Sequence, residues 1–335
     1  MEAPLSGSIA SVRAVPTTGE TAAIVGITLP VRRRLGESGL HVFPLALSGN
    51  VFGLTADATL TRAILDGYAD RGGNFVDTAD SYAAGRSETM IGSWMRERGN
   101  RDDLVIATKI GKGAEHPGLS SPAVAAAVEA SLRRLGTDRI DLLYLHIDDP
   151  EVPFEETLLA VDELIRSGKV RYFGASRHTG ERLIEARIAS AQLGVAPLLA
   201  LQLEYNLLAR RGYEEVLAHV AAQQGLAVMP RFALASGYLS GKYRTRADLA
   251  GAARGREVAR YAGRRGHRVL AVLDRIAAAH DASVATIALA WLLSKPSVVA
   301  PVTSVSRPEQ LFDLMAAAEV ALNRHEVAQL DHASR

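Results

Sequence analysis

The sequence contains no cysteine, and its Lys and Arg residues (38) nearly equal its Asp and Glu residues (37). The lack of cysteine excludes disulfides, thiolate nucleophiles and zinc sites with cysteine ligands. The balanced charge gives no electrostatic reason to expect binding to nucleic acid or to an anionic membrane. No apolar run approaches the roughly 18 residues that are needed to span a bilayer. We therefore expect a cytoplasmic protein without a nucleic-acid or membrane partner.

The chain has 335 residues, of which 48% are hydrophobic, and can build one large domain or two ordinary ones. Residues 1–30 are rich in Ser, Thr, Gly, Ala and Pro and show no sustained period, which predicts a flexible N-terminal extension. The apolar residues 21–31 lack the basic region and the cleavage site of a secretory signal. Two short runs around Ser38 and Gly39 predict a hairpin over 32–42.

From residue 43 onward, strand-length apolar runs alternate with helical patterns at intervals of about 30 residues, the size of a βαβ unit. The runs lie near 43–49, 74–79, 104–110, 140–147, 170–176, 199–206, 226–233 and 298–304. The helical patterns lie near 57–71, 86–97, 120–134, 155–166, 180–192 and 213–223. Such apolar, β-branched strands are typical of parallel sheets that are buried on both faces. Eight units in about 300 residues favour a single α/β domain over 31–335, a (β/α)₈ TIM barrel, rather than a doubly wound sheet.

A longer interval of about 65 residues separates the last two predicted strands. It contains a basic stretch rich in Gly and Arg (244–268) and two helical patterns near 266–280 and 283–294, which we expect as extra C-terminal helices. A long insertion at the catalytic face of a barrel often covers a ligand. A solvated surface excursion explains the same pattern equally well.

Polar side chains lie at the ends of three successive predicted strands. Asp77 comes where the first of these strands ends, and Tyr82 follows just beyond it. Lys109 and His146 lie at the ends of the next two strands. Because the active sites of barrels are built at the carboxyl ends of the strands, we expect these four side chains to form one cluster.

Such a cluster can protonate an alkoxide. A tyrosine is a poor acid at neutral pH, but a neighbouring lysine ammonium lowers the pKa of a phenol. A carboxylate can hold the lysine in place, and a neutral histidine can donate a hydrogen bond to a carbonyl oxygen. This chemistry suits carbonyl reduction, for which a nicotinamide must supply the hydride because no side chain can.

Each of these residues also has an ordinary structural interpretation. An Asp at a strand end often caps a helix or pairs with a cation, a loop Tyr often packs, and a His between Leu and Ile is often a hydrogen-bonded core residue. The presence of all four at one edge of the sheet favours catalysis. A zinc site of His146 with Asp148 and Asp149 is a less favoured alternative, because no other histidine has a ligand-like spacing to it. We expect no metal.

The segments that carry these residues resemble the aldo-keto reductase superfamily, and bacterial NADPH-dependent members in particular. The similar segments are 34–40, 73–82, 87–88, 107–109, 141–146, 168–176, 202–206 and 237–242. Their order is the order of the family, and the resemblance extends over about residues 32–333. It implies a (β/α)₈ barrel that binds NADPH in an extended form without a Rossmann domain. It also implies that Tyr82 is the general acid, that Lys109 and Asp77 tune it, and that His146 orients the carbonyl.

The resemblance further implies a set of cofactor-binding residues. Ser176 and Gln202 match positions that hold the nicotinamide carboxamide, and the loop 231–241 matches the segment under the ring and the pyrophosphate. The run 304–310 is predicted to open the last helix and to hold the 2′-phosphate, which favours NADP over NAD. The full set is Ser176, Arg177, Gln202, Arg231, Phe232, Leu234, Ser236, Gly237, Lys242, Ser304, Ser306, Arg307, Gln310 and Asp313.

Three positions depart from the family pattern, and one of them is Leu314, where a number of members have an Asn that contacts adenine. Arg177 stands where the family usually has Asn, and Arg231 stands where many members place an aromatic residue against the nicotinamide. The favoured function is NADPH-dependent reduction of an aldehyde, ketone or keto-sugar, and the alternative is an NADPH-binding regulatory or sensor subunit with little turnover. Asp148 and Asp149 could bind sugar hydroxyls, but we favour a role in capping the helix that follows Pro150.

Overall fold

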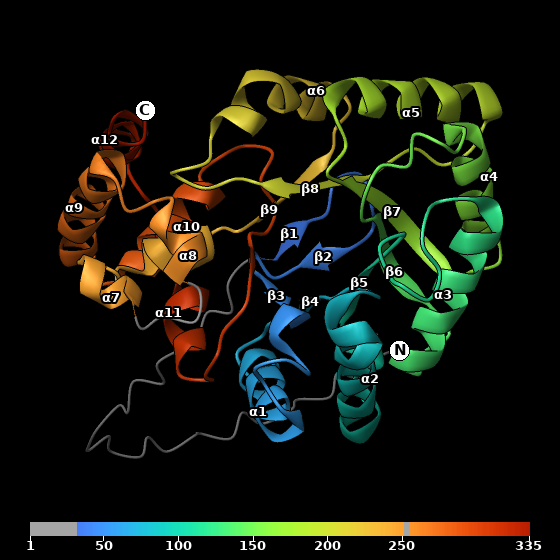
Figure 1. The fold of residues 1–335 in the computed structure, drawn as a ribbon, viewed down its shortest axis with the longest axis horizontal. Helices are drawn as coiled ribbons and strands as arrows, with labels where there is room; N and C mark the ends of the chain where they lie inside the picture. Colours follow the sequence, from blue (N-terminus) through green and yellow to red (C-terminus); the bar gives the residue numbers. More distant parts are fainter. Residues whose placement is uncertain (1–31, 251–254) are drawn as a thin grey trace, which may run out of the picture.

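The computed structural model describes residues 32–250 and 255–335 (Figure 1). The predicted N-terminal extension, 1–30, lies outside the described residues. Eight parallel strands form a nearly closed barrel with helices around it, which confirms the predicted (β/α)₈ TIM barrel. The strands are β3 (Ala46–Ser48), β4 (Phe75–Asp77), β5 (Val105–Ile110), β6 (Ile140–Leu145), β7 (Val170–Ser176), β8 (Ala200–Glu204), β9 (Ala227–Arg231) and β10 (Val302–Thr303).

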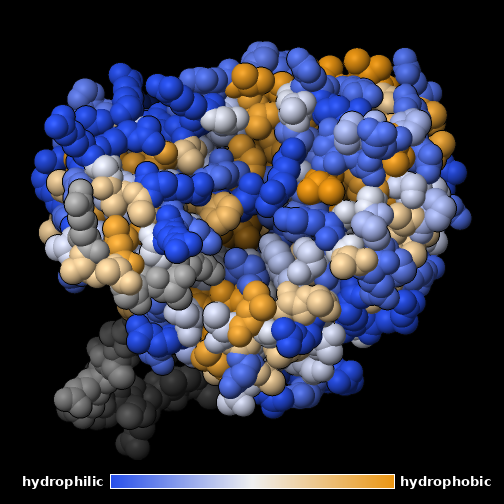
Figure 2. Space-filling view, viewed as in Figure 1, coloured by the Kyte–Doolittle hydropathy of each residue, from blue (hydrophilic) through white to orange (hydrophobic). Residues whose placement is uncertain are grey.

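The strands pair in the order β10-β3-β4-β5-β6-β7-β8-β9. The ring closes between β9 and the segment before β10, where Val228 N donates to Ser297 O at 2.9 Å and Val299 N donates to Val228 O at 3.0 Å. The face of the molecule seen in Figure 2 is hollowed near its centre, and hydrophilic residues surround most of the hollow. Because all eight strands are parallel, their carboxyl ends lie at one edge of the barrel.

The predicted hairpin is confirmed and closes the opposite edge. β1 (Arg33–Arg34) pairs antiparallel with β2 (His41–Val42). Leu35, Leu40 and Val42 are buried and pack with residues from the amino-terminal halves of the barrel strands. The Arg33 guanidinium donates to the carbonyls of Val298 and Leu293, and these hydrogen bonds hold the hairpin against the segment that precedes β10. The amino-terminal edge is thus sealed by apolar packing, which leaves the carboxyl edge for chemistry.

The predicted helices between the strands are confirmed within a few residues at each end. Their starts follow from local caps: Asp57 accepts from Leu60 N at the first helix, and Ser120 precedes the third, which has a proline in its first turn. The helices are α1 (Ala58–Ala69), α2 (Arg86–Arg98), α3 (Ser121–Leu135), α4 (Phe154–Arg166), α5 (Gly180–Leu193), and the π-helical η4 (Tyr213–Leu217) that continues into α6 (Ala218–Gln223).

The interval between β9 and β10 is more helical than the sequence predicted. It holds η5 (Ala235–Ser240), α7 (Arg246–Ala250), α8 (Gly255–Ala259), α9 (Arg264–Ala279) and α10 (Val284–Leu293). The basic stretch 244–268 is therefore not one solvated loop. Part of its charge is paired, since Arg244 contacts Asp274 at 2.7 Å and Arg260 contacts Glu204 at 3.2 Å.

The prediction that 304–310 opens the last helix was wrong. This run leads into α11 (Gln310–Ala316), and α12 (Arg324–Ala333) follows and packs against α9. The extra helix begins at a capping box, in which Asn323 accepts from Glu326 N and the Glu326 side chain accepts from Asn323 N.

No single helix within 32–250 and 255–335 is long and apolar enough to cross a membrane. α9 and α10 would meet that test only together, by length and composition, and the pair is bent by 96°. The apolar character of α10 has a structural cause, because nearly the whole helix is buried in the core.

A buried carboxylate fastens β5 to β6 in the barrel wall. Asp141 is fully buried, and its Oδ2 accepts from Ile106 N at 2.9 Å and lies 2.8 Å from Arg101 Nη2. Its Oδ1 lies 3.1 Å from Arg171 Nη1. A buried charge is tolerated only when it is paired and hydrogen-bonded, so this group depends above all on its two more deeply buried partners, Arg101 and the amide of Ile106.

We expect Asp141→Ala to lower the free energy of unfolding by about 3–5 kcal/mol, because it leaves Arg101 and the amide of Ile106 without their acceptor. Arg171→Ala is the matched control. Its side chain is 43% exposed, so we expect a loss of less than about 1 kcal/mol. Urea unfolding of the two variants measures both values, and equal losses would contradict this account.

Candidate active site

The structure brings Asp77, Tyr82 and Lys109 into one hydrogen-bonded group. Lys109 Nζ donates to Asp77 Oδ1 at 2.6 Å, to Thr78 O at 2.8 Å and to Tyr82 Oη at 3.4 Å. The side chains of Asp77 and Lys109 are each 1% exposed, whereas Tyr82 is half-buried at the start of η2 (Tyr82–Gly85). The ion pair lies below the surface and the phenol lies above it. Only the phenol is therefore placed to meet a molecule that enters from outside.

The ion pair keeps the lysine charged. Burial favours the neutral amine, but the charges of Asp77 and Tyr82 and their hydrogen bonds outweigh it, and the pKa of Lys109 is raised. Gln202 on β8 supports the pair from the other side, since its Nε2 donates to Asp77 Oδ2 at 2.8 Å. Both carboxylate oxygens are thus bound, and Asp77 has one fixed orientation.

His146 follows β6 directly and stands edge-on to the ring of Tyr82, with ring centroids 6.2 Å apart and planes at 85°. Burial and then four nearby positive charges lower the pKa of His146 to about 3. The four cations are Lys109, Lys112, Arg177 and Arg231. The imidazole is therefore neutral at physiological pH and keeps one N–H, and its Nδ1 has no hydrogen-bond partner among the described residues.

Further polar atoms at the same edge also lack partners. Ser176, the last residue of β7, is fully buried, and it pairs in register with Gln202. The hydroxyl of Ser176, the hydroxyl of Ser236 and Nε of Arg231 are buried without a hydrogen-bond partner among the described residues. Buried polar atoms are nearly always bonded, so three orphaned atoms on neighbouring strands and loops mark a place for a polar ligand.

The segment after β9 has an unusual backbone. Phe232, Ala235 and Ser236 have φ of 52°, 50° and 56°, and Gly237 follows with 96°. Non-glycine residues in the left-handed region are strained, and such strain collects at ligand-binding sites. Alternating turns of this kind aim backbone N–H groups into a concave surface that suits anions. Leu234 is half-buried within the segment, and Lys242 is exposed just after it.

The last predicted cofactor residues surround the loop before α11. The amides of Ser306 and Arg307 donate to Gln310 Oε1 at 2.9 and 3.2 Å, and the Ser306 hydroxyl lies 3.2 Å from the same oxygen. One side-chain oxygen thus occupies the position where an anion could accept these hydrogen bonds. Ser304 is half-buried after β10, whereas Arg307 and Asp313 are exposed. Together with the orphaned atoms and the β9 segment, this arrangement offers hydrogen-bond donors to a polar, anionic ligand at the carboxyl edge of the barrel.

The structure does not assemble the ligands of a metal. Within the described residues, no group of three or more His, Cys, Asp and Glu could hold an ion. The predicted capping role of Asp148 and Asp149 was wrong. Asp148 pairs with Arg182 at 3.0 Å, and Asp149 Oδ2 accepts from Leu119 N at 2.8 Å. The N-cap position of α4 is held by Pro153 instead.

A buried acidic pair, Asp80 and Glu88, flanks Tyr82 in the sequence and was not predicted. Glu88 is fully buried, accepts from the Thr108 hydroxyl at 2.6 Å and pairs with Arg134 at 2.7 Å. Asp80 is 8% exposed, and its Oδ2 accepts from Gly113 N at 3.2 Å. Burial, together with the charge of Glu88, raises the pKa of Asp80 to about 6. Asp80 therefore clips the loop after β5 to the loop that carries Tyr82.

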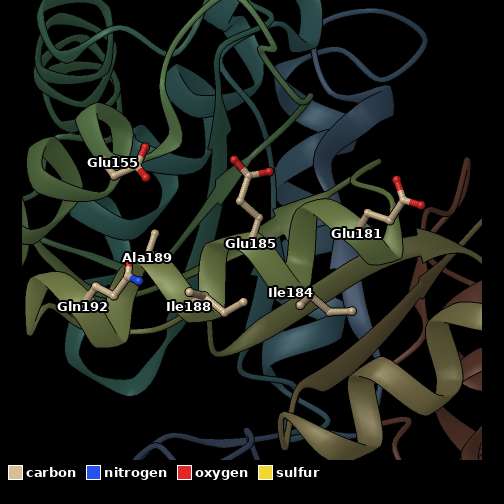
Figure 3. Close-up of a pocket in the computed structure, with 7 residues that line it drawn as sticks. All are labelled: Glu155, Glu181, Ile184, Glu185, Ile188, Ala189 and Gln192. Atoms are coloured by element: carbon tan, nitrogen blue, oxygen red, sulfur yellow. The ribbon is translucent and has the colours of Figure 1, made fainter.

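A separate shallow groove lies along α5 on the outside of the barrel (Figure 3). Glu155 of α4 and Ile184, Glu185 and Ile188 of α5 line it. It contains none of the residues predicted for catalysis or cofactor binding.

Comparisons with known proteins agree with this geometry. A model described as the Aldo/keto reductase family matches residues 49–335. The chain is 34% identical over 298 residues to a probable voltage-gated potassium channel subunit beta of Arabidopsis thaliana, covering 86% of this chain and 91% of the relative. It is 33% identical over 312 residues to the uncharacterized oxidoreductase YrpG of Bacillus subtilis (89% and 94%). It is 30% identical over 321 residues to norsolorinic acid reductase B of Aspergillus parasiticus (88% and 82%).

The raised pKa of Asp80 has a consequence for stability. The carboxyl binds its proton more tightly in the folded chain (about 6) than in the unfolded chain (3.8), so stability falls as the pH rises through this window. We expect Asp80→Asn to be more stable than the wild type by on the order of 2 kcal/mol above about pH 7, and this gain to vanish below about pH 4. Urea unfolding at a series of pH values measures the difference.

The control for this prediction is Asp138→Asn, because the Asp138 side chain is 87% exposed. We expect no comparable pH-dependent gain there. A difference between wild type and Asp80→Asn that stays constant with pH would contradict the prediction.

Proposed function

Because the chain belongs to the aldo/keto reductase family, we propose that it reduces an aldehyde, a ketone or a keto-sugar to an alcohol with NADPH. The family and its oxidoreductase relatives support activity on carbonyl compounds. The observation that carries the finer proposal is the buried Lys109–Asp77 pair, with Tyr82 hydrogen-bonded above it and neutral His146 beside it.

Each of the four side chains has a role in this proposal. Tyr82 donates its phenolic proton to the oxygen of the carbonyl as the carbon is reduced, and Lys109 stabilises the phenolate that remains. Asp77 holds the ammonium in place. His146 donates a hydrogen bond to the carbonyl oxygen and orients it. A reduced nicotinamide supplies the hydride, so the carbonyl gains one hydride at carbon and one proton at oxygen.

The cofactor is proposed to bind along the carboxyl ends of β7 to β10. In this proposal Ser176 and Gln202 hold the carboxamide, which the unpartnered Ser176 hydroxyl supports, and the left-handed segment 232–237 offers N–H groups to the pyrophosphate. Ser306 and Arg307 can hold a 2′-phosphate in place of the Gln310 oxygen, with Lys242 as a further cation. These residues support NADPH over NADH.

The alternative function is an NADPH-binding regulatory or sensor subunit with little turnover. It is favoured by the similarity to probable potassium channel subunits beta, at 34% and 33% identity. The complete set of Asp77, Tyr82, Lys109 and His146 favours the reductase. We also propose that residues 31–335 act as one domain and that the protein is cytoplasmic, which its lack of cysteine supports.

Tyr82→Phe tests the role of the phenol. We expect NADPH oxidation with an aromatic aldehyde or a quinone to fall by about 10²-fold or more, because the general acid is lost. NADPH affinity, measured by fluorescence titration, should change by less than about twofold, since the substitution removes only one oxygen. Undiminished turnover in the variant would contradict the proposal. Tight NADPH binding without turnover by either protein would favour the sensor.

Arg231 generates a second prediction, about the two redox forms of the cofactor. Burial and the charge of Arg177 lower the pKa of Arg231, because both disfavour the positive charge of its guanidinium. The oxidised nicotinamide is itself cationic, so we expect NADP⁺ to bind about tenfold more weakly than NADPH. Arg231→Met should reduce this difference in affinity between NADP⁺ and NADPH. Arg166→Met, at the exposed C-terminal end of α4, should leave it unchanged. Calorimetric titration of both cofactor forms into the wild type and the two variants measures all six affinities, and equal binding of both forms by the wild type would contradict the prediction.

A further inference from the structure

Three cations stand around the mouth of the barrel without a carboxylate partner. Lys112 follows β5, Arg177 follows β7, and Arg231 ends β9. Within the described residues, no carboxylate lies within 4.0 Å of any of them, although many other lysines and arginines of this chain are ion-paired. Glu204, next to Arg231 across β8 and β9, is already bound by Arg260 and by the Tyr261 hydroxyl.

These three charges lie around His146, the residue proposed to orient the carbonyl. Each of them lowers the pKa of His146, and Arg177 also lowers the pKa of Arg231. All three charges therefore act on the same imidazole. β5 and β9 are four places apart in the ring of eight strands, so Lys112 and Arg231 approach the mouth from opposite sides. His146, after β6, lies between them in the ring.

The phosphates of the cofactor would neutralise only part of the positive charge at the mouth. The residues proposed to hold its phosphates, Lys242 and 304–310, belong to the side of β9 and β10. Lys112 lies on the far side of the mouth, in the loop that Asp80 clips to the Tyr82 loop through Gly113 N. Its side chain is exposed, so it is free to meet a molecule above His146.

We propose that this site selects carbonyl substrates that carry an anionic group, such as a carboxylate, and that Lys112 is a specificity-determining residue for that group. The inference rests on the proposed reductase function, because it concerns the substrate that Tyr82 and His146 would engage. An anionic substrate would neutralise the excess charge at the mouth, which no acidic side chain of the described residues does at close range. It would also be drawn to the site from a distance.

The test compares two aldehydes that differ only in charge: 4-carboxybenzaldehyde and methyl 4-formylbenzoate. With saturating NADPH, we expect the wild type to have a kcat/KM at least about tenfold higher for the acid, and the ratio to fall as salt is added. We expect Lys112→Gln to lower this ratio about tenfold. The matched control is Arg166→Gln, which removes the same charge from an exposed site on α4 and should leave the ratio unchanged.

The same two aldehydes are also titrated by calorimetry into protein saturated with NADP⁺, so that the charge preference is measured without turnover. Tighter binding of the acid that depends on Lys112 supports the inference even for a protein that turns over slowly. Turnover of both aldehydes without preference for the acid would overturn charge selection and leave the reductase function standing. A preference that Lys112→Gln and Arg166→Gln lower equally would overturn the role of Lys112.

Discussion

The buried ion pair between Lys109 and Asp77 is the interaction on which the site depends. Two opposite charges at 2.6 Å, each on a side chain that is 1% exposed, are stable only when their remaining donors and acceptors are satisfied. Thr78 O, the Tyr82 hydroxyl and the amide of Gln202 supply those partners. The register of β4, β5 and β8 is therefore set by polar contacts as well as by the apolar core. A slip of one residue would turn one charge of the pair outward and leave the other buried alone.

The barrel and the central cluster could be predicted from the sequence because both follow from short-range patterns. Strand-length apolar runs recur at nearly constant spacing, and Asp77, Lys109 and His146 mark the ends of three of them. The pair of Asp80 and Glu88 could not be predicted in this way. Its partners, Gly113 and Arg134, are 33 and 46 residues away, and only the folded barrel brings them together. The left-handed residues after β9 were also missed, since Phe232, Ala235 and Ser236 carry no glycine-like signal for that backbone.

Charge is unevenly distributed in a molecule whose formal net charge is only +1. On the outer surface, arginines and carboxylates form pairs between neighbouring helices, such as Arg98 with Asp66 and Asp70. Such exposed pairs contribute little to stability. At the mouth, Lys112, Arg177 and Arg231 have no carboxylate within 4.0 Å among the residues that the structure describes, and all three act on one histidine. The sequence composition could exclude a strongly basic protein, but it could not show where the few unbalanced charges gather, because that depends on which loops meet at the barrel edge.

The hairpin covers the amino-terminal edge of the barrel, so that only the carboxyl edge is open. Leu35, Leu40 and Val42 fill the lower end, so nothing can pass through the barrel from that side. Near the carboxyl ends of β7 and β8, Ser176 and Gln202 are 0% and 2% exposed, whereas Tyr82 is only half-buried. Under the proposed function, the cofactor held by the buried Ser176 and Gln202 must bind before the carbonyl substrate that Tyr82 engages, and it can leave only after the product. The order of events in a catalytic cycle would thus follow from the packed interior of the barrel and the hairpin that covers its amino-terminal edge, on the opposite side of the molecule from the chemistry.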